Sequence, residues 1–182
     1  FELIEDAERA CPEALALNYL RVVSASDETV LLEDTLSGER FSLQPHVLVN
    51  AGGAWIDQLN QQLAVHSQPT RLIGGTKGSH LILDHPQLLQ MLDGEMVYFE
   101  NQEGRVCIMF PWFGKVLVGS TDIRVDDPDS VVCEAEEQAY ILESLRFVFP
   151  DIVVPASAVV YTFCGVRPLP ASEAKVNGQI SR

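Results

Sequence analysis

Short apolar and β-branched runs recur through the first third of the chain, and residues that favour turns separate them. Runs of this kind are typical of β-strands. Three such runs follow one another, and they predict a small antiparallel meander at residues 18–24, 29–34 and 39–43. Residues 1–17, rich in acids and alanines, predict a helix, and Pro12 either interrupts it or starts a second turn.

A fourth run, VLVN at residues 47–50, has no polar residue before its final asparagine. A continuous apolar run of this kind predicts a buried strand. It leads into three small residues, AGG, and then into a pattern that predicts a helix over residues 54–63. The expected local order is therefore strand, tight turn and helix.

The rest of the chain predicts a second, larger group of strands. An extended segment is expected at residues 79–83 and a short helix or turn at 84–92. Further strands, the first three at hairpin spacing, are expected at residues 96–100, 105–110, 116–119 and 157–166. A period near 3.6 predicts an amphipathic helix over residues 133–148. The predicted class is mixed α/β (α+β), with a largely antiparallel sheet flanked by helices and a domain border near residues 65–75.

The net charge of the chain limits the kinds of partner that we expect it to bind. The chain of 182 residues has 12 basic and 26 acidic residues and a net charge of −14. Nucleic-acid binding needs clustered Lys and Arg, so we exclude it. An anionic membrane surface would also repel the chain on average, and no apolar stretch has the roughly 20 residues needed to cross a bilayer. A basic side chain inside a pocket would therefore be unusual in this background.

Four cysteines are too far apart to suggest a metal site or a redox pair. They are Cys11, Cys107, Cys133 and Cys164, and none forms a CxxC pair. We expect reduced, mostly buried thiols and no zinc. No signal peptide opens the chain, and the first residue is Phe, so we expect both ends to have been cut from a longer protein.

The segment NAGGAW at residues 50–55 is the first candidate for chemistry. Small residues between a buried strand and a helix let a ligand approach the backbone, as at many dinucleotide and flavin sites. A tight turn that binds nothing has the same pattern. The chain contains no GxGxxG, so a primary pyrophosphate site would lie outside it.

The segment GGTKGSH at residues 74–80 places Lys77 and His80 at the start of an expected strand. It is not a phosphate-binding P-loop, because the lysine precedes its glycine. Lysine offers a compact cation, and histidine exchanges a proton near neutral pH. The alternative is a surface lysine and a histidine at the edge of the core.

Two acidic stretches have simpler structural explanations. In GSTD, residues 119–122, Thr121 and Asp122 favour an Asx-type turn. The acids that follow suit the N-terminal end of a helix and lack calcium-loop spacing; they are Asp126, Asp127, Asp129, Glu134, Glu136 and Glu137.

Arg167 stands between an apolar run and a proline in GVRPLP. Pro168 restricts the backbone of the preceding residue to extended geometry, so the guanidinium projects from a rigid strand end. Its planar fork matches a carboxylate or a phosphate. The alternative is an ion pair with one of the chain's own acids.

These stretches occur together in one known family. VNAGGAWID, RLIGGTKGSHLIL, VCIMFPWFGKVLVGSTDI and GVRPLP resemble the FAD-dependent, quinone-linked glycerol-3-phosphate dehydrogenases, within the glycine-oxidase/D-amino-acid-oxidase superfamily. The resemblance covers about residues 15–172 and implies an internal fragment. Residues 1–68 would be the C-terminal part of a Rossmann-type FAD domain, and 69–182 most of a substrate domain. Two departures are Ala54, where relatives have proline, and two additional glycines before KGSH.

The resemblance also implies roles for individual residues. Arg167 would bind the substrate's phosphate or carboxylate, Lys77 and His80 would line the same pocket, and His80 would accept the proton of the substrate hydroxyl. Backbone contacts to FAD would come from Val23, Ala51, Gly52 and Gly53. No metal is implied.

The implied reaction is oxidation of sn-glycerol 3-phosphate to dihydroxyacetone phosphate, with electrons passing through FAD to a quinone. One alternative is oxidation of an amino or hydroxy acid; another is an excised, non-catalytic binding module. We expect this fragment alone to be inactive and to lack FAD. The family is also often peripheral to the membrane, so we expect a cytoplasmic parent, at the inner face of the cell membrane if it is attached, that can form a homodimer.

Overall fold

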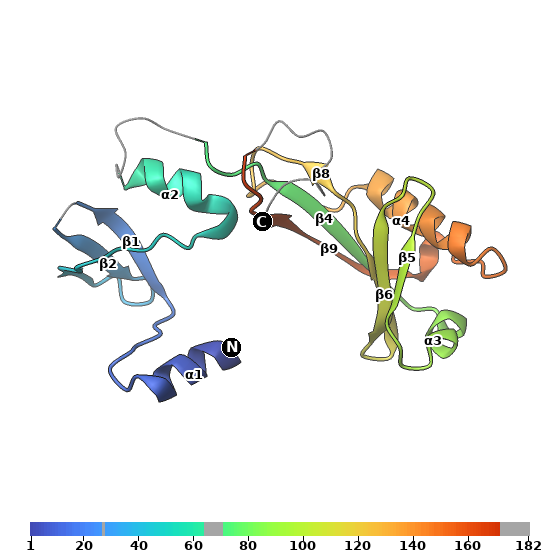
Figure 1. Cartoon of the computed structure of the whole chain (residues 1–182), viewed down its shortest axis with the longest axis horizontal. Helices are drawn as coiled ribbons and strands as arrows, with labels where there is room; N and C mark the ends of the chain where they lie inside the picture. Colours follow the sequence, from blue (N-terminus) through green and yellow to red (C-terminus); the bar gives the residue numbers. More distant parts are fainter. Residues whose placement is uncertain (27, 64–70, 172–182) are drawn as a thin grey trace. The chain divides into compact units, whose positions relative to one another are not determined.

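The computed structural model describes residues 1–26, 28–63 and 71–171, and it divides the chain into two compact units (Figure 1). Unit 1 comprises Phe1–Ala51 and Asp57–Thr70, and unit 2 comprises Gly52–Ile56 and Arg71–Arg182. The division after residue 70 falls inside the range predicted for the domain border. Residues 52–56 belong with unit 2. The sequence predicts two uninterrupted domains and places these residues in the first.

Unit 1 contains the predicted meander. Strands β1 (Leu20–Ala25), β2 (Val30–Asp34) and β3 (Arg40–Leu43) pair antiparallel in that order. Helix α1 (Glu2–Ala10) precedes the sheet, and helix α2 (Ile56–Gln62) follows the short 3₁₀ turn η1 (Gly53–Trp55).

Two predictions in this unit were wrong. The first helix does not extend to residue 17: it ends at Ala10, where Cys11 has extended geometry (φ −135°), and the interruption expected at Pro12 is present because proline cannot supply a helical N–H. Residues 47–50 form no strand, and Val47 and Val49 are each 77% exposed. A strand needs a neighbour for its backbone hydrogen bonds, and the described part of the chain pairs no strand with this segment.

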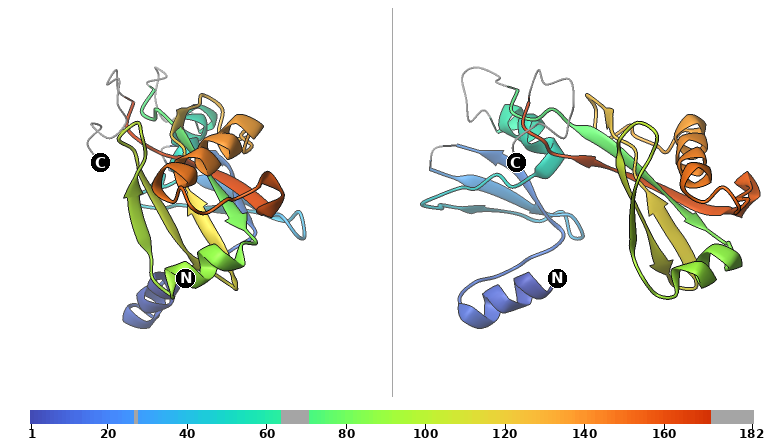
Figure 2. Two further views of the ribbon diagram at one scale, coloured as in Figure 1. Left: turned by 90° about the vertical axis from the view of Figure 1, so that its right-hand side faces the viewer. Right: turned by 45° about the vertical axis from the view of Figure 1, so that its right-hand side comes forward.

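Unit 2 is built on one antiparallel sheet (Figures 1 and 2). Its order is β5–β6–β7–β4–β8, and β9 pairs with the other edge of β4. The strands are β4 (Thr76–Leu83), β5 (Val97–Glu100), β6 (Val106–Trp112), β7 (Lys115–Gly119), β8 (Ile123–Arg124) and β9 (Val159–Arg167). The central strand β4 is therefore covered along both edges.

One face of this sheet carries the hydrophobic core. Helices α3 (Pro86–Leu92) and α4 (Ala135–Val148) contribute to a single buried cluster with the strands. The cluster includes Leu81 and Met109 from the sheet and Leu145 from α4, all at most 1% exposed. A 3₁₀ turn, η2 (Ala156–Ala158), leads into β9. The core fixes one face of β4 against α4 and leaves the alternate side chains on the opposite face.

That opposite face carries two of the predicted site residues. On β4, the side chains of residues 78, 80 and 82 alternate with the core-facing Leu81 and Leu83, because successive side chains of a strand point to opposite faces. His80 lies between Gly119 on β7 and Phe163 on β9, and Arg167 pairs with Thr76. Arg167 and His80 therefore belong to one face of the sheet, on neighbouring strands.

The partner strand of β4 is irregular between β7 and β8. Gly119, the last residue of β7, lies opposite His80, and Ile123, the first residue of β8, lies opposite Lys77. Three residues, 120–122, thus face the two residues 78 and 79 of β4. A bulge of this kind inserts one residue and redirects nearby side chains. Here it turns the GSTD segment toward the end of β9.

Candidate functional site

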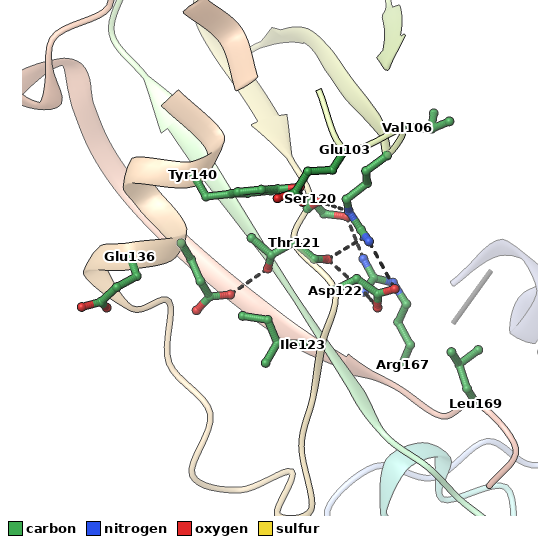
Figure 3. A pocket seen from close by; sticks show the side chains of 13 residues that line it. Glu103, Val106, Ser120, Thr121, Asp122, Ile123, Glu136, Tyr140, Arg167 and Leu169 are labelled. Carbon is green, nitrogen blue, oxygen red and sulfur yellow. Dashed lines mark hydrogen bonds and ion pairs between the residues drawn. The ribbon is translucent and has the colours of Figure 1, made fainter. Parts of the chain in front are cut away.

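The guanidinium of Arg167 is held by the bulge (Figure 3). Its Nη2 donates to Ser120 Oγ at 2.8 Å, and its Nη1 donates to Thr121 O at 3.4 Å and lies 3.5 Å from Asp122 Oδ1. The side chain is 32% exposed. A charged group that is fixed by neighbours yet reachable from solvent can bind an anion without first being ordered.

Gly78 makes room for this guanidinium. A Cβ placed on Gly78 would lie 2.2 Å from Arg167 Nη2 and 2.5 Å from its Cζ. No larger residue could stand at this position without moving the arginine. The glycine of KGSH therefore has a packing role that spacing arguments did not reveal.

His80 is enclosed in a similar way. Its ring stacks on Phe163 with centroids 5.0 Å apart and planes inclined by 9°, and a Cβ on Gly119 would lie 2.2 Å from His80 Cδ2. Its buried Nδ1 has no hydrogen-bond partner within the described residues. Burial first, and then the positive charge of Arg167, lower the pKa of His80 below its ordinary value of 6.5. The imidazole is consequently neutral at pH 7 and available as a base.

Lys77 lies on the opposite face of β4 from Arg167 and His80, whereas the sequence led us to expect all three in one pocket. Its side chain is 7% exposed, its Nζ lies 2.6 Å from Glu137 Oε2, and it donates to Val132 O at 2.7 Å. The physical reason is strand geometry: positions 77 and 80 are three apart, so their side chains point to opposite faces. Burial lowers the pKa of Lys77, but the hydrogen bond and charge of Glu137 outweigh it, and the net pKa is raised.

Glu137 is the centre of a buried polar cluster that supports the site from the core side. Its Oε1 accepts from Ser79 Oγ and Thr121 Oγ1, both at 2.7 Å. Its Oε2 accepts from the backbone N–H of Glu134 in a capping box at the start of α4. The carboxylate thus joins α4, β4 and the bulge, and it fixes the segment that contacts Arg167.

Arg105, at the start of β6, is a site residue that the sequence prediction missed. It donates from Nε to Ser120 O at 2.7 Å and from Nη2 to Thr121 O at 2.9 Å, and its Nη1 lies 3.2 Å from Asp122 Oδ2. The carboxylate of Asp122 is therefore shared by Arg105 and Arg167, so the alternative of an ion pair between Arg167 and one of the chain's own acids is present, where the sequence suggested only an Asx-type turn at Asp122. An arginine just before a hairpin strand gives no signal of this role, because residues 120–122 come next to it only when β6 and β7 pair.

A pocket of about 830 Å³ borders this arginine pair (Figure 3). Its wall combines cations, acids and apolar groups; these include Glu103, Arg105, Asp122, Tyr140, Arg167 and Leu169. His80 and Lys77 are not among its lining residues. Arg167 consequently stands between this pocket and the face that carries His80.

The four residues expected to contact FAD lie in different local settings. Val23 is the extra residue of a bulge in β1, because Val22 and Ser24 oppose consecutive residues of β2. Gly53 has φ +59°, and among the described residues no atom beyond its own chain neighbours lies within 4 Å of the position a Cβ would take. Gly52 precedes it at the start of η1, and Ala51 ends the first segment of unit 1. An open backbone at Gly53 fits the close approach of a flavin nucleotide.

Other classes of site find no support in the described residues. No group of three or more His, Cys, Asp or Glu residues there could hold a metal ion. The helices of that part of the chain are all too short or too polar to cross a bilayer. The four cysteines are free thiols, of which Cys107 is buried and Cys11 exposed. The expectation of mostly buried thiols was therefore wrong for Cys11, which follows a solvated helix.

Arg167 and His80 lie on one face of an antiparallel sheet, and Gly53 leaves its backbone open; both features suit the flavoprotein class expected from the sequence. The chain matches the family described as FAD dependent oxidoreductase (DAO) over residues 9–181. It belongs to that family, and the resemblance seen in the sequence is confirmed.

Named relatives agree with this assignment. The chain is 32% identical over 154 residues to an aerobic glycerol-3-phosphate dehydrogenase of Bacillus subtilis, covering 84% of this chain and 27% of the relative. It is 33% identical over 184 residues to a glycerol-3-phosphate dehydrogenase of Synechocystis, covering 93% and 33%. The chain thus spans about a third or less of the length of these relatives.

A solved structure shares the fold. The glycerol-3-phosphate dehydrogenase from Bacillus halodurans, crystallised with FAD, superposes with a TM-score of 0.76 and 30% sequence identity over 90% of this chain and 34% of that one. The predicted mixed α/β class with antiparallel sheets is confirmed.

Proposed function

We propose that the full-length protein containing this chain oxidises sn-glycerol 3-phosphate to dihydroxyacetone phosphate and passes the electrons through FAD to a quinone. The observation that carries the proposal is the placement of Arg167 and a neutral His80 on one face of the sheet. The names of the relatives support the choice of substrate. The open backbone at Gly53 leaves room for FAD, which supplies the hydride acceptor when it is bound.

Arg167 binds the phosphate in this proposal. Its side chain extends over Gly78, and His80 lies two residues further along the same face of β4. Two residues of a strand span about 6.6 Å. A three-carbon phosphate ester can therefore place its phosphate at the guanidinium and a carbinol group near the imidazole. The fixed fork orients the substrate, and orientation is a large part of the rate enhancement.

His80 accepts the hydroxyl proton as the substrate carbon is oxidised. A general base must be unprotonated at working pH, and both burial and the charge of Arg167 keep His80 neutral. The same arginine therefore binds the anion and maintains the base. The stack on Phe163 and the contact with Gly119 fix the direction of the ring.

A second candidate is oxidation of an amino or hydroxy acid, with Arg167 on the carboxylate. The burial of Lys77 favours this alternative, because it removes one of the two cations that the sequence offered to a phosphate dianion. Activity of the full-length protein on glycerol 3-phosphate, compared with amino and hydroxy acids, decides between the two. Preference for a carboxylate substrate would reject the phosphate assignment.

Substitutions test the roles within the full-length protein. For Arg167→Lys we expect kcat/KM to fall by about ten- to a hundredfold, as for the loss of a charged hydrogen bond of about 1.5–3 kcal/mol. For His80→Gln we expect kcat to fall by about 10²–10⁴. Arg146→Lys is a matched control, because Arg146 makes only a surface pair with Glu143 among the described contacts. Unchanged kcat/KM in Arg167→Lys would reject anion binding by this residue.

The cellular setting is also part of the proposal. A quinone acceptor requires access to a membrane, so we place the full-length protein in the cytoplasm at the inner face of the cell membrane, with a homodimer as its expected assembly. Fractionation of cells together with the molar mass of the purified protein tests both. A protein found wholly in the soluble fraction, active only with water-soluble acceptors, would reject the quinone.

A further inference from the structure

We propose that Asp122 is a positioning residue that sets the direction of the Arg167 guanidinium, with Arg105 holding Asp122 in place. The inference rests on the proposed function, because it concerns how the anion-binding group is aimed. Asp122 is not expected to touch substrate. It acts through Arg167, and its own position depends on the bulge between β7 and β8.

Arg105 contacts Asp122, and Asp122 in turn contacts Arg167. Asp122 is only 16% exposed, and its two oxygens serve different partners: Oδ2 lies 3.2 Å from Arg105 Nη1, and Oδ1 lies 3.5 Å from Arg167 Nη1. Arg105 is 26% exposed and binds two backbone carbonyls of the bulge as well. The more buried arginine thus fixes the carboxylate, and the carboxylate guides the more exposed arginine.

Gly78 also limits where the guanidinium of Arg167 can lie. The guanidinium of Arg167 lies so close to Gly78 that a methyl group there would overlap it. Ser120 holds Nη2 from the side at 2.8 Å. The planar group is thereby restricted by a carboxylate, a hydroxyl and a glycine, three constraints that together specify one orientation. Binding two anion oxygens at once requires such an orientation, because the fork is planar.

The charge of Asp122 allows an experiment to distinguish its effect on the orientation of the Arg167 guanidinium from its effect on the attraction of an anion. A carboxylate beside Arg167 weakens the local positive potential, so its removal should strengthen the attraction of an anion while it loosens the guanidinium. In full-length Asp122→Asn we expect kcat with glycerol 3-phosphate to fall at least tenfold, and inorganic phosphate to inhibit two- to tenfold more strongly. A residue with a merely structural role would weaken both turnover and phosphate binding.

A double-mutant cycle with Arg167→Gln tests whether Asp122 acts through the arginine. We expect Asp122→Asn to lower kcat less than twofold when Arg167 is already replaced, and Gly78→Ala likewise to lose its effect in that background. Asp84→Asn is the control for removal of an acid, because Asp84 pairs with Lys115 at the far end of β4. Additive losses in the cycle, or an Asp122→Asn enzyme as active as the control, would overturn the inference.

Phosphate binding tests the positioning role of Asp122 even if glycerol 3-phosphate is not the substrate. Failure of the wild-type protein to oxidise it would reject the proposed function alone. Titration calorimetry with inorganic phosphate would then compare wild type with Gly78→Ala and Asp122→Asn. Binding at least fivefold weaker in Gly78→Ala, with no weakening in Asp122→Asn, supports the inference, and wild-type affinity in Gly78→Ala overturns it.

Discussion

Lys77 and His80, three residues apart on β4, point to opposite faces of the same sheet. Lys77 reaches Glu137 in the core, and His80 stacks on Phe163 on the open face. The KGSH motif therefore serves two purposes. Its lysine and serine bind α4 and the bulge through Glu137, while its glycine and histidine belong to the candidate site.

The Lys77–Glu137 pair should be necessary for folding. Removing one partner leaves a buried charge without compensation, and we expect Lys77→Met to destabilise the fold by about 3–5 kcal/mol. Denaturant unfolding measures the loss. Glu143→Gln, which breaks an exposed pair with Arg146, should change the free energy of unfolding by less than about 1 kcal/mol. Equal effects of the two substitutions would contradict a structural role for the buried pair.

The same pair predicts how stability depends on pH. Burial raises the pKa of Glu137, but hydrogen bonds, first from Lys77, outweigh it and lower the pKa below its ordinary value of 4.5. The stability that Glu137 contributes is therefore present above pH 4.5 and is lost as pH falls through the depressed pKa. The pKa of Lys77 is raised above 10.5, so its contribution is present below that pH and is lost as pH rises through the raised pKa. Denaturant unfolding at several pH values should show both losses in wild type and neither in a Lys77→Met, Glu137→Gln double variant.

His80 should control the acidic side of the activity profile. Its pKa lies below 6.5, so we expect kcat/KM to fall only below that pH. Arg167→Gln removes one of the two causes of the shift and should move the acidic limb to higher pH. Measured pH profiles of the full-length enzyme check this, with NMR titration of the histidines as an independent readout. A limb that does not move in Arg167→Gln would argue that the arginine does not act on this base.

Gly119→Ala should displace the ring of His80 without changing the anion binding of Arg167. The added methyl group would overlap His80 Cδ2, so the imidazole must turn away from Phe163. We expect kcat to fall at least tenfold while inhibition by inorganic phosphate stays within twofold of wild type. Steady-state kinetics separate the two effects. Weaker phosphate inhibition would show that the rearrangement spreads to Arg167.

The 182-residue chain by itself should not retain FAD. It contains no GxGxxG motif, and its relatives are about three times longer. We expect the purified chain to be colourless and inactive with glycerol 3-phosphate. Absorbance near 450 nm and cofactor analysis after denaturation measure the flavin. Stoichiometric FAD in the purified chain would contradict this prediction and would indicate a complete binding site within it.

Local patterns were sufficient for most elements of the fold. Short β-branched runs and turn residues predicted the meander and the hairpin strands, and the 3.6 period predicted α4. They were not sufficient where a segment depends on distant partners. Residues 47–50 have the composition of a buried strand, yet composition cannot supply the neighbouring strand.

The candidate site was predictable in part for the same reason. Arg167 and His80 could be recognised from their motifs, and they do share one face of the sheet. The burial of Lys77 could have been inferred from the two-residue period of a strand beginning at residue 76. The role of Arg105 could not have been predicted, because its contacts with residues 120–122 arise only when β6 and β7 pair and the bulge forms.

The extra residue between β7 and β8 lets this segment change length by one residue without reversing β8. Gly119 and Ile123 are four positions apart and would share one face of an uninterrupted strand, but their partners on β4, His80 and Lys77, point to opposite faces. Deleting one residue from 120–122 would leave two residues opposite positions 78 and 79, so Ile123 would stay opposite Lys77 and only the bulge would disappear. An alignment gap of one at this point in a homologue would therefore indicate a regular strand edge without the bulge that contacts Arg167.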